Sequence, residues 1–91
     1  MKKVRKHIIF YGRVQGVGFR YTACYLARPL GLTGWVKNLW DGSVEMEVQG
    51  PESDIETMLK RLQNGRFIQI DRMDIQEIPV RSEHDFVEVW D

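Results

Sequence analysis

Residues 7–30, HIIFYGRVQGVGFRYTACYLARPL, run through three kinds of pattern in immediate succession. The first part alternates, with Ile8, Phe10 and Val14 on one side, which predicts a strand with one face on a core. The chain then enters a short loop at 15–18, where two glycines relieve the steric limits on the backbone. A strand that feeds directly into a glycine-rich loop is the feature from which the rest of the fold is worked out.

An amphipathic helix is predicted after this loop. Apolar residues recur at helical spacing from Phe19 to Leu30, which gives the helix one apolar stripe. Pro29 lies in its last turn and Gly31 just beyond, a combination that predicts the end of the helix. Pro29 cannot donate a hydrogen bond to the carbonyl of Tyr25, so we expect some distortion of that turn.

The remaining chain continues with a hairpin, a second helix and two further strands. Strands are predicted at about 33–39, 43–49, 70–78 and 86–90, with a turn at 41–42 between the first two. Ser53 and Glu56 have the spacing of a capping box and predict the start of the second helix, which Asn64 and Gly65 end. Glu88 interrupts the apolar face of the last strand and favours an edge position for it.

The order β-α-β-β-α-β with an added terminal strand predicts an α+β, ferredoxin-like sandwich. Right-handed crossovers place both helices on one face of an antiparallel sheet, with the short C-terminal strand at its edge. A chain of 91 residues is long enough for one core, so we expect residues 1–91 to form a single domain. Many unrelated functions share this fold, and function must be argued from a site.

Composition excludes several classes of protein. Lys and Arg number 13, as do Asp and Glu, and this zero net charge argues against a nucleic-acid binder. No apolar run approaches the roughly 18 residues of a membrane span, and no targeting segment is visible, so we expect a cytoplasmic protein. The single cysteine, Cys24, excludes an internal disulfide and a multi-cysteine metal site.

The loop between the first strand and the first helix is a candidate anion site. Amide groups of a glycine-rich turn converge there with the unpaired donors and the positive dipole end of a helix. Phosphate commonly binds in such places, and Arg20 in the first helical turn can fold over the same anion. The loop lacks the Gly-Lys-Ser/Thr of a Walker motif, and Tyr21 stands where a dinucleotide fingerprint has its third glycine. The alternative is a tight turn with a solvated arginine.

Asn38, at the end of the second strand, is a second candidate. Asparagine commonly caps a turn, and Asn38 precedes the turn at Asp41 and Gly42. In this topology the first and second strands are parallel, with the third between them. The first crossover starts after the first strand and ends before the second, so topology alone need not bring Asn38 close to the anion site. A loop that folds back over the sheet would do so.

Three stretches together carry a resemblance to a known family: GRVQGVGFR at 12–20, LGLTGWVKN at 30–38 and DGSVE at 41–45. Over essentially its whole length the chain resembles the small stand-alone bacterial acylphosphatases. The resemblance implies hydrolysis of acyl phosphates to a carboxylate and inorganic phosphate without a metal or other cofactor. It also implies that Arg20 binds phosphate and that Asn38 orients the attacking water. The backbone of the loop would form the phosphate cradle, through Gln15, Gly16, Val17, Gly18 and Phe19.

The expected partners follow from this chemistry. We expect a small-molecule acyl phosphate as substrate, inorganic phosphate or sulfate as competing anions, no nucleic acid, no membrane, and a monomer. The alternative function is a non-catalytic anion- or nucleotide-binding module of the same fold, which would not need a water-orienting amide. Glu45 and Glu47 on the open sheet face argue against RNA. Pro29, Lys37 and Glu88 depart from the family pattern outside its motif residues.

Other reactive side chains are assigned structural roles. We expect Cys24 to pack in the core, and His7 and His84 to be surface residues. Trp35, Trp40 and Trp90 are expected to pack or to be partly exposed rather than to contact substrate. No cluster of His, Cys and Asp has metal-ligand spacing.

Overall fold

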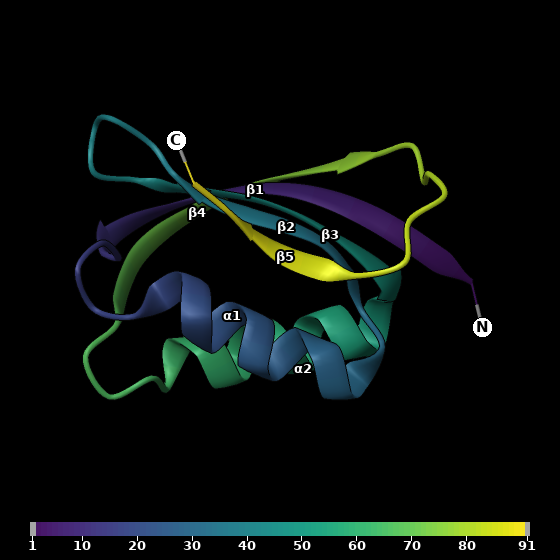
Figure 1. Ribbon diagram of the computed structural model, residues 1–91, viewed down its shortest axis with the longest axis horizontal. Helices are drawn as coiled ribbons and strands as arrows, with labels where there is room; N and C mark the ends of the chain where they lie inside the picture. The colour runs from purple at the N-terminus through teal and green to yellow at the C-terminus, as the bar shows by residue number, and fades with distance from the viewer. Residues whose placement is uncertain (1, 91) are drawn as a thin grey trace.

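The computed structural model describes residues 2–90 and contains a five-stranded sheet covered on one face by helices (Figure 1). Its strands are β1 (Lys3–Arg13), β2 (Thr33–Asn38), β3 (Val44–Pro51), β4 (Gln69–Ile78) and β5 (Phe86–Val89). Its helices are α1 (Phe19–Ala27), a 3₁₀ turn (Arg28–Leu30) and α2 (Glu52–Gln63). No helix in this part of the chain is long and apolar enough to cross a membrane.

The strands lie in the order β4-β1-β3-β2-β5. The pairings β4–β1, β1–β3 and β3–β2 are antiparallel, and both helices pack on the same face. This confirms the ferredoxin-like sandwich and the edge position of the last strand. Because β5 pairs with β2 in parallel, the sheet is mixed rather than wholly antiparallel.

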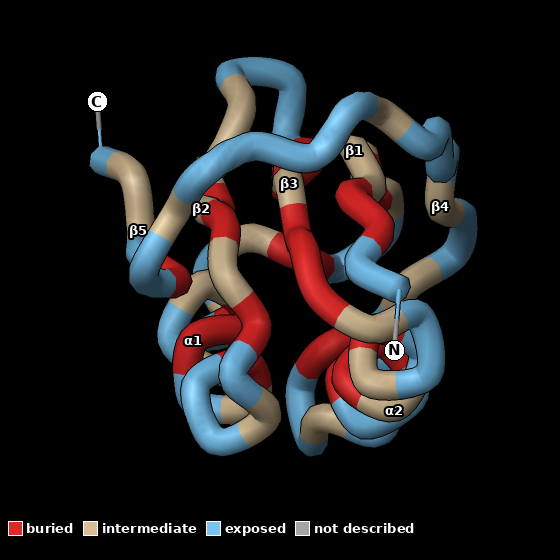
Figure 2. Tube along the Cα trace, turned by 90° about the vertical axis from the view of Figure 1, so that its right-hand side faces the viewer, coloured by how far each residue is buried: buried red, intermediate tan, exposed pale blue. Residues whose placement is uncertain are grey.

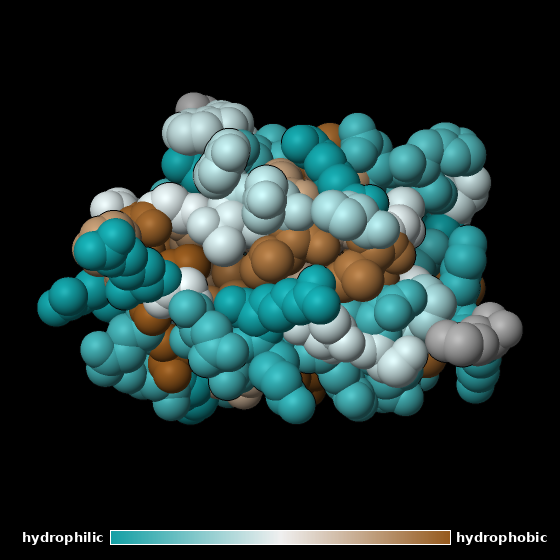
Figure 3. Space-filling view, turned by 90° about the horizontal axis from the view of Figure 1, so that it is seen from below, coloured by the Kyte–Doolittle hydropathy of each residue, from teal (hydrophilic) through white to brown (hydrophobic). Residues whose placement is uncertain are grey.

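The core lies between the sheet and the helices. Ile8 and Phe10 on the helical side of β1 and Val14 directly after β1 are buried, as their alternation predicts. The burial-coloured tube has its buried segments where sheet and helices face each other (Figure 2). Seen from the helical side, apolar side chains are visible as a band between polar ones (Figure 3).

The end of α1 and the start of α2 can be compared with the helix boundaries predicted from the sequence. α1 passes into the 3₁₀ turn that contains Pro29 and stops at Gly31, which has a left-handed φ of 70°, so the predicted stop is confirmed. The predicted capping box of α2 is wrong. The helix starts at Glu52 with Pro51 as its N-cap, and Ser53 lies inside the first turn, where its carbonyl accepts a hydrogen bond from Thr57.

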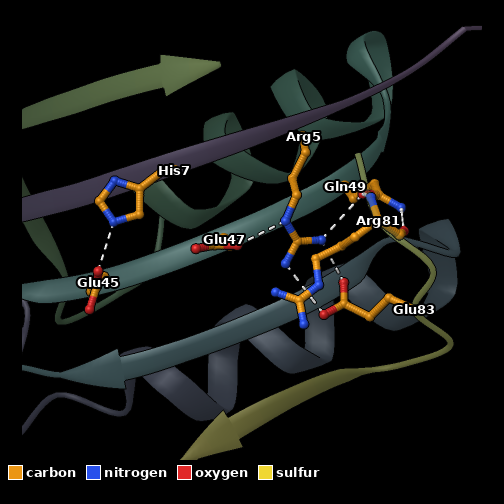
Figure 4. A network of polar contacts seen from close by, with 7 residues as sticks. All are labelled: Arg5, His7, Glu45, Glu47, Gln49, Arg81 and Glu83. Carbon is orange, nitrogen blue, oxygen red and sulfur yellow. Dashed lines mark hydrogen bonds and ion pairs between the residues drawn. The ribbon is translucent and has the colours of Figure 1, made fainter. Parts of the chain in front are cut away.

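A buried arginine organises the open face of the sheet (Figure 4). Arg5 on β1 is 0% exposed; its Nε donates to Glu47 at 2.8 Å and its Nη1 to Glu83 at 2.8 Å. Burial disfavours its charge, but the hydrogen bonds and charges of Glu83 and Glu47 prevail and raise the pKa of Arg5. Gln49 also accepts from Arg5 and exchanges two hydrogen bonds with the backbone of Arg81. The network thus fastens the loop before β5 to the sheet.

We expect Arg5→Ala to lower the free energy of unfolding by about 3 kcal/mol, because it leaves two carboxylates without their cation. We take the lower end of the range usual for breaking a buried ion pair, because the Glu47 and Glu83 side chains are still 19% exposed to solvent. Chemical denaturation measures the change. Lys60→Ala, which removes an exposed cation from α2, serves as the control. An Arg5→Ala loss no larger than that of the control would contradict a stabilising role for this network.

Candidate functional site

The cradle loop, residues 14–18, joins the end of β1 to the start of α1. Gly16 and Gly18 have left-handed φ values of 73° and 77°, which side chains other than glycine rarely adopt. Gly18 is the N-cap of α1, and its carbonyl accepts the first helical hydrogen bond from Thr22 at 2.9 Å. The amides of the first turn, at 19–21, therefore have no acceptor within the helix and are available to an anion.

Gln15 connects the cradle loop to the β2–β3 hairpin. Its side-chain Nε2 donates to the carbonyl of Leu39 at 2.6 Å and to that of Ser43 at 2.8 Å. The sequence suggested only a backbone role for Gln15, because nothing local reveals a partner 24 or more residues away. This side chain fixes the distance between the loop and the strand end that carries Asn38.

The sequence left open whether topology alone brings Asn38 to the cradle, and the structure shows that strand direction does so. β1 and β2 are both antiparallel to β3, so they run parallel to each other and end at the same edge of the sheet. Phe10 of β1 and Asn38 of β2 are both register partners of Val44 on β3. Strand direction, rather than the course of the crossover, thus places Asn38 one strand away from the base of the cradle loop.

A cavity of about 340 Å³ lies where these elements meet. Five of the predicted site residues line it: Gly16, Gly18, Phe19, Arg20 and Asn38. Its other lining residues are Val14, Tyr21, Glu88 and Trp90. The two remaining predicted residues do not line it: Gln15 reaches the hairpin, and Val17 packs against the core.

The hairpin turn does not depend on Asn38. Asp41 accepts hydrogen bonds from the amide of Ser43 at 3.0 Å and from its hydroxyl, and these bonds lower the pKa of Asp41. Leu39 and Gly42 supply the backbone hydrogen bonds of the turn. Within residues 2–90 the Asn38 side chain makes no hydrogen bond. Its amide group is therefore available to a ligand in the cavity.

Arg20 is stacked on the indole of Trp90. Its guanidinium carbon lies 3.5 Å from the ring centroid, which is cation–π distance, although Trp90 itself is 68% exposed. Stacking occupies one face of the guanidinium and leaves the N–H donors in its plane for an anion. Sequence reasoning gave Trp90 no role here, because a contact between residues 20 and 90 has no local signal.

The remaining reactive residues have structural surroundings. Cys24 is 3% exposed, and burial is the main cause that raises the pKa of its thiol, which makes it a poor nucleophile. His7 pairs with Glu45 at 2.7 Å on the open face of the sheet, away from the cavity, and His84 is exposed. Among residues 2–90 no group of three His, Cys, Asp or Glu could hold a metal ion.

Comparison with known proteins gives one consistent result. The family model for acylphosphatase matches residues 6–88. The chain is 51% identical to an acylphosphatase of Geobacillus kaustophilus over 84 residues, 91% of this chain and 87% of that protein. It is 43% identical to one of Bifidobacterium longum over 81 residues, covering 88% and 84% of the two chains. The crystal structure of acylphosphatase from Bacillus subtilis superposes with a TM-score of 0.89 at 37% identity, covering 96% of this chain and 99% of that one. The chain belongs to the acylphosphatase family.

Proposed function

We propose that Arg20 and the amides of residues 15–19 bind the phosphoryl group of the acyl phosphate that this acylphosphatase hydrolyses, and that Asn38 places the attacking water. The observation that carries this proposal is that Gly16, Gly18, Arg20 and Asn38 all line one and the same cavity. Donors for a tetrahedral anion and a side-chain amide for a water thus converge on one small volume.

The reaction asks little more of the protein. The oxygen of water attacks phosphorus in line, and the bond from phosphorus to the acyl oxygen breaks as the carboxylate leaves. A carboxylate is stable as an anion, so no general acid is needed to protonate it. The proton of water passes to a phosphoryl oxygen, which suits a loose transition state with little demand for a base. The lack of a histidine in the cavity is consistent with this chemistry.

Each part of the cavity then has one task. Negative charge on the phosphoryl oxygens is stabilised by donors that are already oriented, the amides at the start of α1 and the guanidinium of Arg20. Trp90 restricts the guanidinium to one plane, which reduces the reorganisation needed when substrate binds. The side-chain carbonyl of Asn38 accepts a hydrogen bond from the water. This orients the water so that a lone pair of its oxygen points to phosphorus.

The wider setting is part of the same proposal. We place the protein in the cytoplasm as a monomer, with residues 1–91 as one domain and no nucleic-acid partner. On the open face, Arg5 and His7 are paired with Glu47 and Glu45, so these two side chains are not free to bind a polyanion.

The decisive test of the function is release of inorganic phosphate from benzoyl phosphate by the purified chain. We expect turnover well above the spontaneous rate, and we expect it to survive exhaustive treatment with EDTA, because the proposed steps use amide, guanidinium and carboxamide groups only. Activity that is lost with EDTA and restored by Mg²⁺ or Zn²⁺ would require a different mechanism. Binding of phosphate without turnover would favour the alternative, a non-catalytic anion-binding module.

Inorganic phosphate and sulfate are expected to inhibit competitively, because both are tetrahedral anions that fit the cradle. Initial rates over a matrix of substrate and inhibitor concentrations measure this. We expect KM to rise with inhibitor concentration while kcat stays constant. A fall in kcat at constant KM would place these anions outside the proposed cradle.

A further inference from the structure

Glu88 is a carboxylate on the helical side of the sheet. In the parallel ladder it is paired with Val36 of β2, which is fully buried against the helices. Side chains of paired residues lie on the same face of a sheet, so Glu88 also points toward the helical layer. Phe86, two residues earlier on β5, points the same way and is 0% exposed. An acidic side chain is unusual in such a position, which ordinarily takes an apolar residue.

Within residues 2–90 the Glu88 side chain has neither a hydrogen bond nor an ion pair. The nearby arginines of α1 and its 3₁₀ extension have other contacts. Arg20 is stacked on Trp90, and Arg28 donates to the carbonyl of Phe86 and lies 3.9 Å from Asp85. The carboxylate of Glu88 is therefore half-buried and without an ion-pair partner among residues 2–90, at the edge of the proposed anion-binding cavity.

Glu88 also stands where two cavities adjoin. It lines the 340 Å³ cavity of the cradle and a second cavity of about 530 Å³, and Tyr21 is the other residue common to both. The second cavity extends along α1 past Cys24 and Tyr25, and Arg28 and Arg61 also line it. Tyr21 and Glu88 therefore lie on the route by which an acyl group can extend from the cradle into the second cavity.

We propose that Glu88 sets the charge selectivity of the enzyme, disfavouring acyl phosphates whose acyl group carries a negative charge and favouring neutral or cationic ones. The inference rests on the proposed phosphoryl site. An acyl group that extends from the cradle into the second cavity passes Glu88, which is the acidic residue among those that line the two cavities. Like charges a few ångströms apart near a protein surface change a rate or binding constant roughly three- to tenfold.

The test compares three substrates that differ only in a para substituent. They are benzoyl phosphate, 4-carboxybenzoyl phosphate and 4-(trimethylammoniomethyl)benzoyl phosphate. We expect Glu88→Gln to raise kcat/KM for the carboxy substrate relative to benzoyl phosphate by roughly three- to tenfold, and to lower that of the cationic substrate relative to it. Glu88→Lys should reverse the order of the two charged substrates.

Glu77→Gln is the matched control, because it removes the same charge from an exposed residue of β4, at the opposite edge of the sheet. It should leave all three ratios unchanged. An equal change for all three substrates in Glu88→Gln, accompanied by tighter binding of inorganic phosphate, would mean that Glu88 acts on the phosphoryl group and would overturn the inference. Absence of turnover of benzoyl phosphate by the unaltered chain would instead refute the proposed function.

Discussion

Arg20→Ala is expected to lower kcat/KM for benzoyl phosphate by about 10²- to 10³-fold while the protein stays folded. The magnitude is that of removing an oriented donor from a developing oxyanion. Stability should change little, because Arg20 lies in the first turn of α1 and its side chain contacts the exposed Trp90 rather than the core. Steady-state kinetics and a thermal melt measure the two effects.

A second substitution of Arg20 separates geometry from charge, and a substitution elsewhere serves as the control. Arg20→Lys keeps the charge but replaces a planar fork of donors with a compact ammonium, so we expect it to remain far below the unaltered enzyme. Arg66→Ala removes an exposed arginine from the loop after α2 and should have normal activity. Near-normal turnover in Arg20→Ala or Arg20→Lys would refute the assignment of Arg20 to the phosphoryl group.

The local part of the site could be predicted because its physics is local. A strand that alternates up to Val14, glycines at 16 and 18 and an arginine in the next helical turn all lie within residues 7–20. The positive φ angles, the helix start at Phe19 and the place of Arg20 in the cavity agree with that prediction. Backbone conformations that only glycine adopts easily are read from sequence with few alternatives.

Contacts between distant segments could not be predicted in the same way. Arg5 lies in a strand that the alternation placed only from His7 onward, and its partner Glu83 is 78 residues away. The Arg20–Trp90 stack joins the first helix to the end of the chain. Ser53 fits a capping box, yet the N-cap of α2 is Pro51, two residues earlier than that motif implies. A motif of two residues cannot outweigh the fixed φ of proline at a helix entrance.

Two roles are possible for Asn38, capping the turn or orienting the water, and the structure makes them easier to separate by experiment. If Asn38 only capped the turn, Asn38→Ala would cost about 1 kcal/mol of stability and leave the chemistry intact. The turn is already held by Asp41, Leu39 and Ser43, so we expect little loss of stability. We expect instead that Asn38→Ala loses most of kcat, because the water is no longer aimed at phosphorus.

Phosphate affinity should survive in Asn38→Ala, because the cradle and Arg20 are unaltered. Asp41→Ala is the matched control on the same hairpin. It removes the hydrogen bonds that hold the turn and should lower the melting temperature, with a smaller effect on kcat than Asn38→Ala. The measurements are kcat, KM, phosphate affinity and melting temperature for both variants.

Asn38→Asp extends the test to electrostatics. A carboxylate can still accept a hydrogen bond from water, but it introduces a negative charge into a cavity that binds an anion. We expect phosphate affinity to fall in Asn38→Asp as well as kcat, whereas Asn38→Ala loses kcat alone. Normal kcat with a lowered melting temperature in Asn38→Ala would refute the water-orienting role and leave Asn38 as a residue of the turn.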